Sequence, residues 1–558
     1  MTAQNDAATW PYKNASLPIQ DRVDDLLARM TTAEKAGLLF QNMVVMGPGG
    51  QLATKDNTPY FPCTNEVIGE KLMNHLNLLG PVTDVREMVE WHNRLQKRAQ
   101  ETRLGIPVTL STDPRNHFSD NAGTGFNAGV MSQWPETLGL AAIRSPELVE
   151  QFANVARQEY LALGFRLALH PQIDLATEPR WSRIGKTMGE DADLTSELVS
   201  AYIRGFQGPI LGPSSVSTMT KHFPGGGPQK DGEDPHFTYG REQVYPGDHF
   251  EYHMRPFKAA IAAGTTQMMP YYGMPVGTKY EEVGFAFSKG IITDLLKGEL
   301  GFQGIVCTDW GLITDTNILG QDMPARAWGV EHLSEAERVQ KIIEAGCDQF
   351  GGESRPELVV QLVEEGKVSM DRIDASVRKL LREKFVLGLF DNPFIDVDTA
   401  VATVGNPDFA KQGLDAQHLV SSPELADLAF LRLQAPFEPR PGGFESMFHA
   451  GSLEFSAAEK ERQAAIYEAV PTIVDVYLDR PAIIPEVATS AAALMVSYGS
   501  SGRAFLNVVL GVAAPEGKLP FDLPSSTKAV EESRPDVPYD SKDPIFKFGH
   551  GLRYQNSK

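Results

Sequence analysis

The stretch Gly304-Ile305-Val306-Cys307-Thr308-Asp309-Trp310-Gly311 joins a short apolar run to a carboxylate at its end. A run of this length, rich in β-branched residues, predicts a buried strand that presents Asp309 at its C-terminal tip. Taken alone, an aspartate after a strand more often caps a helix or closes a turn. The same pattern recurs along the chain, and this recurrence favours a functional role for Asp309.

Five further apolar runs in the first 360 residues also end in polar groups, and each precedes a plausible helix. The runs are Ile106 to Ser111, Phe165 to His170, Ser215 to Thr220, Thr266 to Met269 and Cys347 to Phe350. The polar groups after them include Asp113, Asp174, Lys221, His222, Tyr271, Tyr272 and Glu353. Strands that alternate with helices pair in parallel, and a closed (β/α)8 barrel gathers its strand C-termini on one face. We therefore predict that residues 1–390 form such a barrel, with the chemistry at that face.

A second domain is predicted after the amphipathic pattern of Arg372 to Leu389, which stops at Asp391-Asn392-Pro393. Residues 391–408 are expected to form a linker. Residues 409–558 are expected to form a smaller α/β domain, a sandwich of alternating elements. Its strand patterns are Ala429 to Leu433, Ile473 to Leu478 and Ala493 to Ser497, and its helical patterns are Ala457 to Ala469 and Gly502 to Leu510.

Composition narrows the classes of partner. The chain of 558 residues carries a formal net charge of −21. Such acidity disfavours nucleic acids and anionic membranes, which attract basic surfaces, and favours a neutral ligand. No apolar stretch reaches the roughly 18 residues of a membrane helix, and Met1 to Trp10 lacks the features of a signal peptide. The chain is expected to be soluble, either in the cytoplasm or, after removal of a signal, outside it.

The cysteines do not indicate a disulfide framework or a metal centre. Cys63, Cys307 and Cys347 are the three in the chain, and their spacing fits neither. No cluster with metal-ligand spacing occurs in the sequence. We therefore predict neither a metal nor another cofactor.

Six motifs, in this order and spacing, resemble glycoside hydrolase family 3. They are Glu178-Pro179-Arg180-Trp181, Gly189-Glu190-Asp191, Lys221-His222-Phe223-Pro224-Gly225, Thr308-Asp309-Trp310-Gly311, Glu516-Gly517-Lys518-Leu519-Pro520 and Phe548-Gly549-His550-Gly551-Leu552. The resemblance covers nearly the whole chain and is strongest to exo-acting β-glucosidases. It implies that a sugar binds between the barrel and the α/β sandwich.

The resemblance assigns roles to residues at the strand ends. Hydrolysis with retention requires a carboxylate nucleophile and a carboxylic acid about 5 to 5.5 Å apart. By resemblance, Asp309 is the nucleophile, and Asp113, Arg180, Lys221 and His222 bind sugar hydroxyls. A salt bridge from Arg180 to Glu178 or Glu190 is an alternative that is compatible with binding.

Three further side chains are expected near the nucleophile. Tyr272 matches a tyrosine that lies beside it in the family, with Tyr271 as a weaker candidate, and a core aromatic is the alternative. Trp310 offers an apolar wall to the sugar ring or packs in the barrel. His236 matches an acid/base histidine of a single-domain branch of the family, but the loop around it differs from that branch, so this role is disfavoured.

The acid/base is expected in the loop from Gln434 to Glu445 of the second domain. Glu438, after Pro436-Phe437, is favoured over Glu445, although one residue of the family pattern is missing before it. A solvated loop charge is the alternative for either residue. The working acid needs a raised pKa, which burial against substrate and the charge of Asp309 would supply.

The second domain departs from the family pattern at its start. Val420-Ser421-Ser422-Pro423 runs almost directly into Glu424, where the family has a strand and its loop. A true deletion predicts an exposed sheet edge, and pairing with another copy in a homo-oligomer is one way to cover it.

The expected function is that of a retaining exo-β-glucosidase acting on a small carbohydrate. The sequence leaves three alternatives open: a β-xylosidase, a noncatalytic sugar-binding relative, and a glycosidase that uses phosphate in place of water. Linkage preference depends on loop walls that the sequence does not define.

Overall fold

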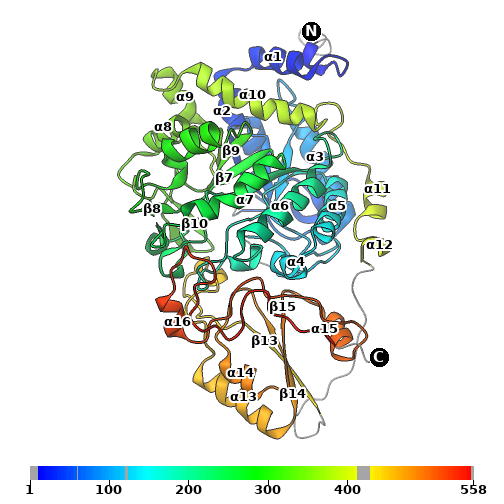
Figure 1. The fold of residues 1–558 in the computed structure, drawn as a ribbon. Coiled ribbons are helices and arrows are strands. Elements are labelled where there is room, and N and C mark those ends of the chain that lie inside the picture. The colour runs from blue at the N-terminus through cyan, green and yellow to red at the C-terminus, as the bar shows by residue number, and fades with distance from the viewer. Residues whose placement is uncertain (1–9, 60, 120–123, 411–427, 555–558) are drawn as a thin grey trace.

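The computed structural model of the protein describes residues 10–59, 61–119, 124–410 and 428–554. Among these residues, eight parallel strands close into a barrel in the order β1-β12-β9-β7-β5-β4-β3-β2 (Figure 1). Their bounds are β1 Phe40–Val44, β2 His75–Leu78, β3 Thr109–Thr112, β4 Phe165–Ala168, β5 Ser217–Phe223, β7 Gln267–Pro270, β9 Ile305–Trp310 and β12 Gln349–Gly351. Because β1 pairs with both β2 and β12, the ring is closed, and the predicted (β/α)8 barrel is confirmed.

The apolar runs predicted six of these strands and did not reveal β1 or β2. Both strands carry polar side chains that are buried inside the barrel. The Gln41 Nε2 atom donates to the Ser111 Oγ atom at 2.7 Å, and the Asn77 Oδ1 atom accepts from the same hydroxyl at 3.1 Å. A polar layer whose groups satisfy one another costs little to bury, so a barrel strand does not need a continuous apolar run.

Helices surround the barrel on its outside, as the alternating pattern requires. They are α1 Ile19–Arg29, α2 Thr32–Leu38, α3 Val85–Gln100, α4 Thr137–Ile143, α5 Pro146–Leu163, α6 Ala192–Gln207, α7 Phe250–Ala262, a π-helical segment Gly290–Glu299, α8 Glu335–Ala345, α9 Pro356–Glu364 and α10 Met370–Val386. Local signals fix several ends. Helix α8 starts at a capping box formed by Ser334 and Glu337, and α5 ends at Gly164, whose φ of 86° suits glycine.

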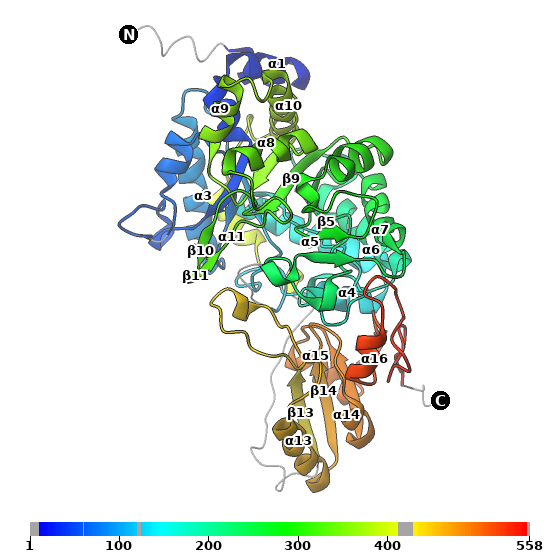
Figure 2. The same cartoon turned by 90° about the vertical axis from the view of Figure 1, so that its left-hand side faces the viewer.

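The strand C-termini carry the longer loops and face the second domain (Figure 2). These loops include the hairpin β10 Thr316–Ile318 and β11 Gln321–Met323, and the parallel pair β6 Glu242–Val244 and β8 Met274–Val276. Helices α1 and α10 lie at the opposite end of the barrel (Figure 1).

The second domain contains a three-stranded parallel sheet in the order β13-β14-β15 within the described residues. Its elements are β13 Ala429–Gln434, α13 Ala457–Ala469, β14 Thr472–Tyr477, α14 Pro485–Ser490, β15 Ala493–Ser497, α15 Gly502–Val509 and α16 Thr527–Glu532. The predicted strands and helices of this domain therefore occur within a residue of their expected bounds. The missing family strand was expected between 419 and 424, which lies outside the described residues.

The predicted linker at 391–408 is partly helical. Helices α11 Val397–Thr403 and α12 Pro407–Ala410 begin in it, and α11 packs against α3 and α5. The chain therefore follows the side of the barrel before it enters the second domain (Figure 1). None of the helices in the described ranges has the length and apolar character needed to span a membrane.

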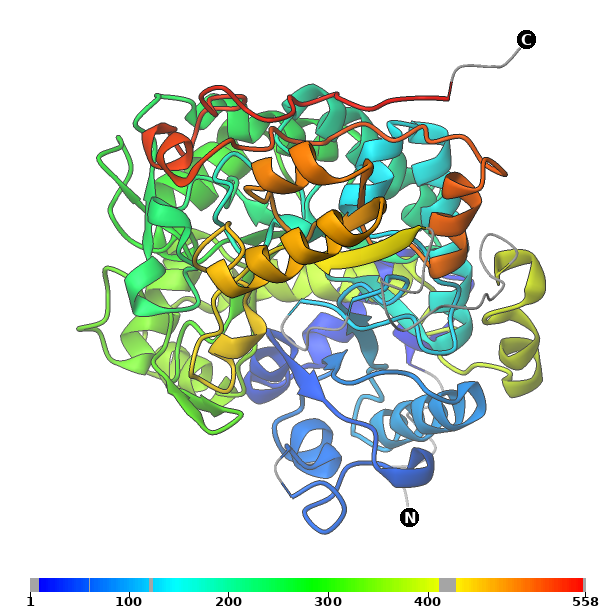
Figure 3. The ribbon, with the colours of Figure 1, turned by 90° about the horizontal axis from the view of Figure 1, so that it is seen from below.

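The C-terminal segment returns to the barrel beside the second domain, and the view from below shows it running along one side (Figure 3). The Thr177 Oγ1 atom donates to the carbonyl of Pro535 at 2.6 Å, and Asp536 accepts from the backbone N–H groups of Gly247 and His249. Glu190 accepts from the backbone N–H groups of Asp522 and Tyr539, each at 2.7 Å. These contacts fix the loops after β4 and β6 to the C-terminal segment.

Burial of Glu190 makes the free energy of unfolding depend on pH. Burial, with a contribution from the neighbouring Asp522, raises the pKa of Glu190 from 4.5 to about 8. The folded state therefore holds this proton up to about pH 8, whereas the unfolded chain loses it near pH 4.5. The associated stability is fully present below pH 4.5 and declines as pH rises towards 8.

We predict that Glu190→Gln lowers the melting temperature most at about pH 5 and least at about pH 9. The amide loses one hydrogen bond at every pH, which lowers stability by a constant amount. Because the amide cannot ionise, the stability of the variant does not fall between pH 4.5 and 8 as that of the wild type does, so the difference is largest at low pH. Calorimetric melting of both proteins across this pH range measures the difference. Parallel melting curves over this range would contradict the assignment.

Candidate active site

Lys221 and Asp113 form a buried ion pair at the C-terminal face of the barrel. Lys221 lies in β5 and Asp113 directly follows β3, two strands apart in the barrel, and their long and short side chains meet over the end of β4. The Lys221 Nζ atom donates to the Asp113 Oδ1 atom at 2.9 Å. Their side chains are 6% and 11% exposed, which leaves a small open surface through which a ligand hydroxyl can reach both charges.

His222 is held by Asp174, which follows β4. The His222 Nδ1 atom lies 2.7 Å from Asp174 Oδ2, and the Asp174 Oδ1 atom accepts from the backbone N–H groups of His222 and Gly226. Burial lowers the pKa of His222 well below its usual range, and nearby Arg183 adds to this effect. The imidazole is therefore neutral. With Nδ1–H donating to Asp174, its Nε2 atom is an acceptor for a ligand hydroxyl.

Asp309 lies in β9, on the opposite side of the barrel from β3 in the strand order. Its Oδ1 atom accepts from the Trp310 N–H at 2.8 Å. Its Oδ2 atom is buried, has no hydrogen-bond partner in the described part of the chain, and lies 3.7 Å from the His222 Nε2 atom. A buried oxygen without a partner is costly unless a ligand uses it.

Tyr272 fixes the backbone beside Asp309. Its hydroxyl donates to the Trp310 carbonyl at 2.9 Å and accepts from the Trp310 N–H at 3.0 Å. Burial and the adjacent Asp309 charge raise the pKa of Tyr272 well above its usual range, so it stays a neutral donor. Trp310 is half-buried and packs on the barrel-interior cluster that includes Met269 and Cys307. Tyr271 is fully buried next to the His222 ring.

The structure brings Arg183, and not the predicted Arg180, to the charges around Asp309. The Arg180 Nε atom donates to Glu178 at 2.8 Å, so the alternative salt bridge of the sequence analysis is confirmed. Arg183 is 5% exposed. Burial lowers its pKa, but the neighbouring Tyr271, Asp234, Asp309 and Asp174 side chains together raise this pKa above its usual value. The two arginines are three residues apart in the loop after β4, and the course of that loop brings Arg183 close to Asp309 and Asp174.

Glu438 and Glu445 differ in their surroundings. The Glu445 side chain accepts from the Tyr239 hydroxyl and lies 3.6 Å from the Arg440 guanidinium. Glu438 is exposed, its backbone pairs with Ala450, and its carboxylate forms no hydrogen bond or ion pair with the described residues. Of the two carboxylates, Glu445 therefore has partners and Glu438 has none among the described residues.

Arg480 anchors both ends of the loop that carries these glutamates. This side chain, 1% exposed, follows β14. It donates to the carbonyls of Pro436 at 2.7 Å, Ala450 at 3.0 Å and Ser452 at 2.8 Å. It also reaches the barrel, where its second terminal nitrogen donates to the Arg180 carbonyl at 3.2 Å. One guanidinium therefore sets the position of the loop relative to the barrel.

Aromatic rings complete the contact between the loop and the barrel. His236 lies 4.6 Å from the Tyr272 ring and 5.1 Å from the Phe448 ring, measured between centroids. Its Nδ1 atom lies 2.5 Å from Asp234 Oδ1. Phe237, Phe444 and Phe448 pack with Met323 of the β10–β11 hairpin. His236 therefore links the second-domain loop to Tyr272 and so to Asp309.

Metal ions require several ligand side chains grouped around one point. In the described ranges, no three His, Cys, Asp or Glu side chains are grouped so that they could hold an ion. The polar groups at the barrel mouth are instead two carboxylates paired with a lysine and a histidine, one arginine, and the unpaired oxygen of Asp309. This arrangement suits a neutral polyhydroxylated ligand.

Two family models match the chain. The glycosyl hydrolase family 3 N terminal domain matches residues 62–383, and the glycosyl hydrolase family 3 C-terminal domain matches residues 395–554. Together they cover both structural domains described above.

Relatives and solved structures agree with these matches. A protein of Aspergillus flavus named probable beta-glucosidase C is 58% identical, covering 98% of this chain and 92% of that protein. A periplasmic beta-glucosidase/beta-xylosidase of Dickeya chrysanthemi is 38% identical, covering 97% and 91%. A mutant of the exo-1,3/1,4-beta-glucanase ExoP from a Pseudoalteromonas species has the same fold, with a TM-score of 0.74 at 20% identity and 98% coverage of each chain.

The Aspergillus alignment extends over 585 positions, more than the 558 residues of this chain. That relative therefore contains positions without a counterpart in this chain. With two family models matched across most of its length and a relative at 58% identity over nearly all of it, the chain belongs to glycosyl hydrolase family 3.

Proposed function

We propose that this protein is a retaining exo-β-glucosidase, which removes terminal β-D-glucosyl residues from the non-reducing end of small glycosides. The unpaired, buried Oδ2 atom of Asp309 is the observation that carries this proposal. It is the atom that would attack the anomeric carbon. The proposal includes the division into a barrel before 391–408 and a sandwich domain after it.

The reaction proceeds in two displacements. In the first, Asp309 bonds to the anomeric carbon while Glu438 gives its proton to the leaving oxygen, so the glycosidic bond breaks. In the second, Glu438 takes a proton from water, and the resulting hydroxide replaces Asp309 on the sugar. Each displacement inverts the configuration of the anomeric carbon, so the product keeps the β configuration. One water molecule is consumed for each glycosidic bond that is cleaved.

The paired charges act on the remaining hydroxyls of the sugar. Lys221 donates and Asp113 accepts, neutral His222 accepts at Nε2, and Arg183 supplies further donors. Asp113 follows β3, across the barrel from β9, and its ion pair with Lys221 of β5 is buried. It would stop a sugar chain from extending past the terminal residue, which favours exo action. Trp310 and the His236–Tyr272 contact would border the leaving group.

A β-xylosidase is the second candidate, because the Dickeya relative carries both activities in its name. A xyloside lacks the C6 hydroxymethyl group, so the two activities differ in the contacts to that group alone. Aryl β-D-xyloside and aryl β-D-glucoside are therefore both needed as substrates.

We predict that Asp309→Ala lowers kcat on 4-nitrophenyl β-D-glucoside by at least about 10³-fold, because the nucleophile is lost. Glu438→Ala should be reactivated by azide and yield β-glucosyl azide, since the anion needs no general base. Glu445→Ala is the matched control and should show neither effect. Product analysis by NMR in phosphate-free buffer identifies the azide. If azide rescues Glu445→Ala and not Glu438→Ala, Glu445 is the acid/base instead of Glu438. A wild type that hydrolyses no β-glycoside would favour the noncatalytic sugar-binding alternative.

We also predict that Arg480→Lys impairs only those substrates that need acid assistance. Lysine keeps the charge but cannot reach several carbonyls at once, so the loop carrying Glu438 would lose its position. Turnover of methyl β-D-glucoside should fall at least about 10-fold, whereas 2,4-dinitrophenyl β-D-glucoside, whose leaving group needs no proton, should change less than about 3-fold. Arg86→Lys, at an exposed ion pair with Asp398, is the control. Equal losses on both substrates would indicate general destabilisation instead.

A further inference from the structure

Arg326 lies between the β10–β11 hairpin and α8, and it returns to the end of β9. Its backbone N–H donates to the Gly311 carbonyl at 2.9 Å. A Cβ atom at Gly311 would lie 2.5 Å from the Arg326 Nη1 atom, so the glycine leaves room for the guanidinium. The guanidinium also lies 5.9 Å from the centre of the Tyr272 ring. Because Asp309 precedes Gly311 by two residues, Arg326 belongs to the surroundings of Asp309.

Within the described part of the chain, the Arg326 side chain has no hydrogen bond and no ion pair. It is only 3% exposed, and its Nε atom is buried and unpaired. The other buried lysines and arginines of the described ranges do have partners, and Lys384, for example, donates to three oxygen atoms. Removing a guanidinium from water without a partner is costly. A ligand that supplies the missing acceptors would remove this cost.

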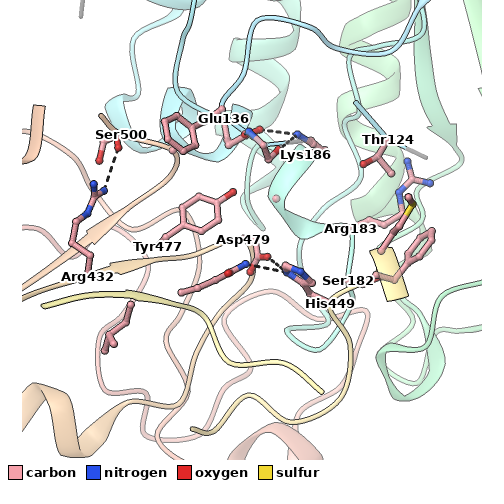
Figure 4. Close-up of a pocket in the computed structure, with 18 residues that line it drawn as sticks. Thr124, Glu136, Ser182, Arg183, Lys186, Arg432, His449, Tyr477, Asp479 and Ser500 are labelled. Atoms are coloured by element: carbon pink, nitrogen blue, oxygen red, sulfur yellow. Dashed lines mark hydrogen bonds and ion pairs between the residues drawn. The ribbon is translucent and has the colours of Figure 1, made fainter. Parts of the chain in front are cut away.

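The cleft of about 560 Å³ between the barrel and the second domain shows the opposite arrangement. There, the Lys186 Nζ atom donates to Glu136 at 2.8 Å, and His449 pairs with Asp479 (Figure 4). These cations have a carboxylate partner within the chain, whereas Arg326 has none among the described residues. A carboxylate on a ligand would therefore disturb the pairs of the cleft, but it would complete the contacts of Arg326.

Two unpaired donors lie on the β9 side of the barrel mouth. One is Arg326, and the other is the buried Nε1 atom of Trp310, which has no partner within the described residues. The hydroxyl-binding Asp113 follows β3, across the barrel from β9, so the β9 side is left for the leaving group. An indole N–H and a guanidinium can only donate and so require acceptors. A carboxylate offers two acceptor oxygens, and it matches the fork of the guanidinium in a bidentate pair.

We propose that Arg326 selects β-glucosides whose leaving group carries a carboxylate, such as the glucosides of hydroxybenzoic acids. The inference rests on the proposed function, and it names the class of leaving group that this function prefers. The terminal glucosyl residue is neutral, and the paired charges across the barrel bind its hydroxyls. Arg326 is thus a specificity residue that takes no part in the exchange of bonds.

The test compares 4-carboxyphenyl β-D-glucoside with 4-carbamoylphenyl β-D-glucoside, which have nearly the same shape and differ by one charge. We expect the kcat/KM of the wild type to be at least about 10-fold higher for the carboxylate, the gain expected for a charge-assisted hydrogen bond. Arg326→Gln removes the charge and should lower the ratio of the two kcat/KM values at least about 10-fold. The intrinsic reactivity of each substrate cancels when these ratios are compared. Arg241→Gln, at an exposed ion pair with Glu331, is the matched control and should leave the ratio unchanged.

Equal kcat/KM values of the wild type for the two substrates would overturn the inference. An unchanged ratio in Arg326→Gln would also overturn it, because a purely structural role predicts equal losses on both substrates. If circular dichroism shows that Arg326→Gln does not fold, Arg326→Lys replaces it. Its ratio should fall at least about 3-fold, because lysine cannot form the bidentate pair.

A different result would contradict the proposed function. It is a wild type that hydrolyses neither of these substrates nor 4-nitrophenyl β-D-glucoside. Calorimetric titration of the wild type with the two glucosides then decides the inference separately. Tighter binding of the carboxylate would support the role of Arg326, and equal affinities would overturn it.

Discussion

Burying charge at the mouth of the barrel is the constraint on which the rest of the structure depends. Ionised groups removed from water are costly unless each has a partner, and here the strand order provides partners. Lys221 from β5 meets Asp113 after β3, and His222 meets Asp174 after β4. When these pairs are formed, one oxygen of Asp309 remains unsatisfied among the described residues. The fold therefore leaves one buried carboxylate oxygen without a partner among these paired charges.

Glu438, the proposed acid, depends on a different kind of support. Glu438 belongs to a loop outside the barrel, and a loop is less well fixed than a strand end. Arg480 compensates by bonding carbonyls at both ends of that loop and one on the barrel, while the aromatic cluster around His236 packs its far end against Tyr272. The C-terminal segment adds a third attachment through Glu190. The position of Glu438 relative to Asp309 is thus set by contacts between domains rather than by either domain alone.

The sequence predicted the fold where apolar runs are continuous, and it failed where the barrel interior is polar. Strands β5 and β9 were evident, but Gln41 and Asn77 interrupt β1 and β2, and the hydrogen bonds that make these residues tolerable come from β3. The site was predicted at strand ends, because strand direction fixes side chains there. It was less well predicted in loops. The residues around Arg180 and Arg183 in the sequence do not show which of them lies near Asp309. The hydrogen-bond partner of Glu445 is Tyr239, 206 residues earlier in the chain, so the sequence around Glu445 does not reveal it.

The most direct test of this account is to identify the residue that becomes covalently bonded to the sugar. The protein is incubated with 2,4-dinitrophenyl 2-deoxy-2-fluoro-β-D-glucoside, which slows the second displacement more than the first, and is then digested for peptide sequencing by mass spectrometry. We expect a single fluoroglucosyl ester on Asp309, lost on transfer to an added acceptor. An ester on any other carboxylate, or turnover of the reagent without a covalent intermediate, would contradict the assignment of Asp309 as the nucleophile.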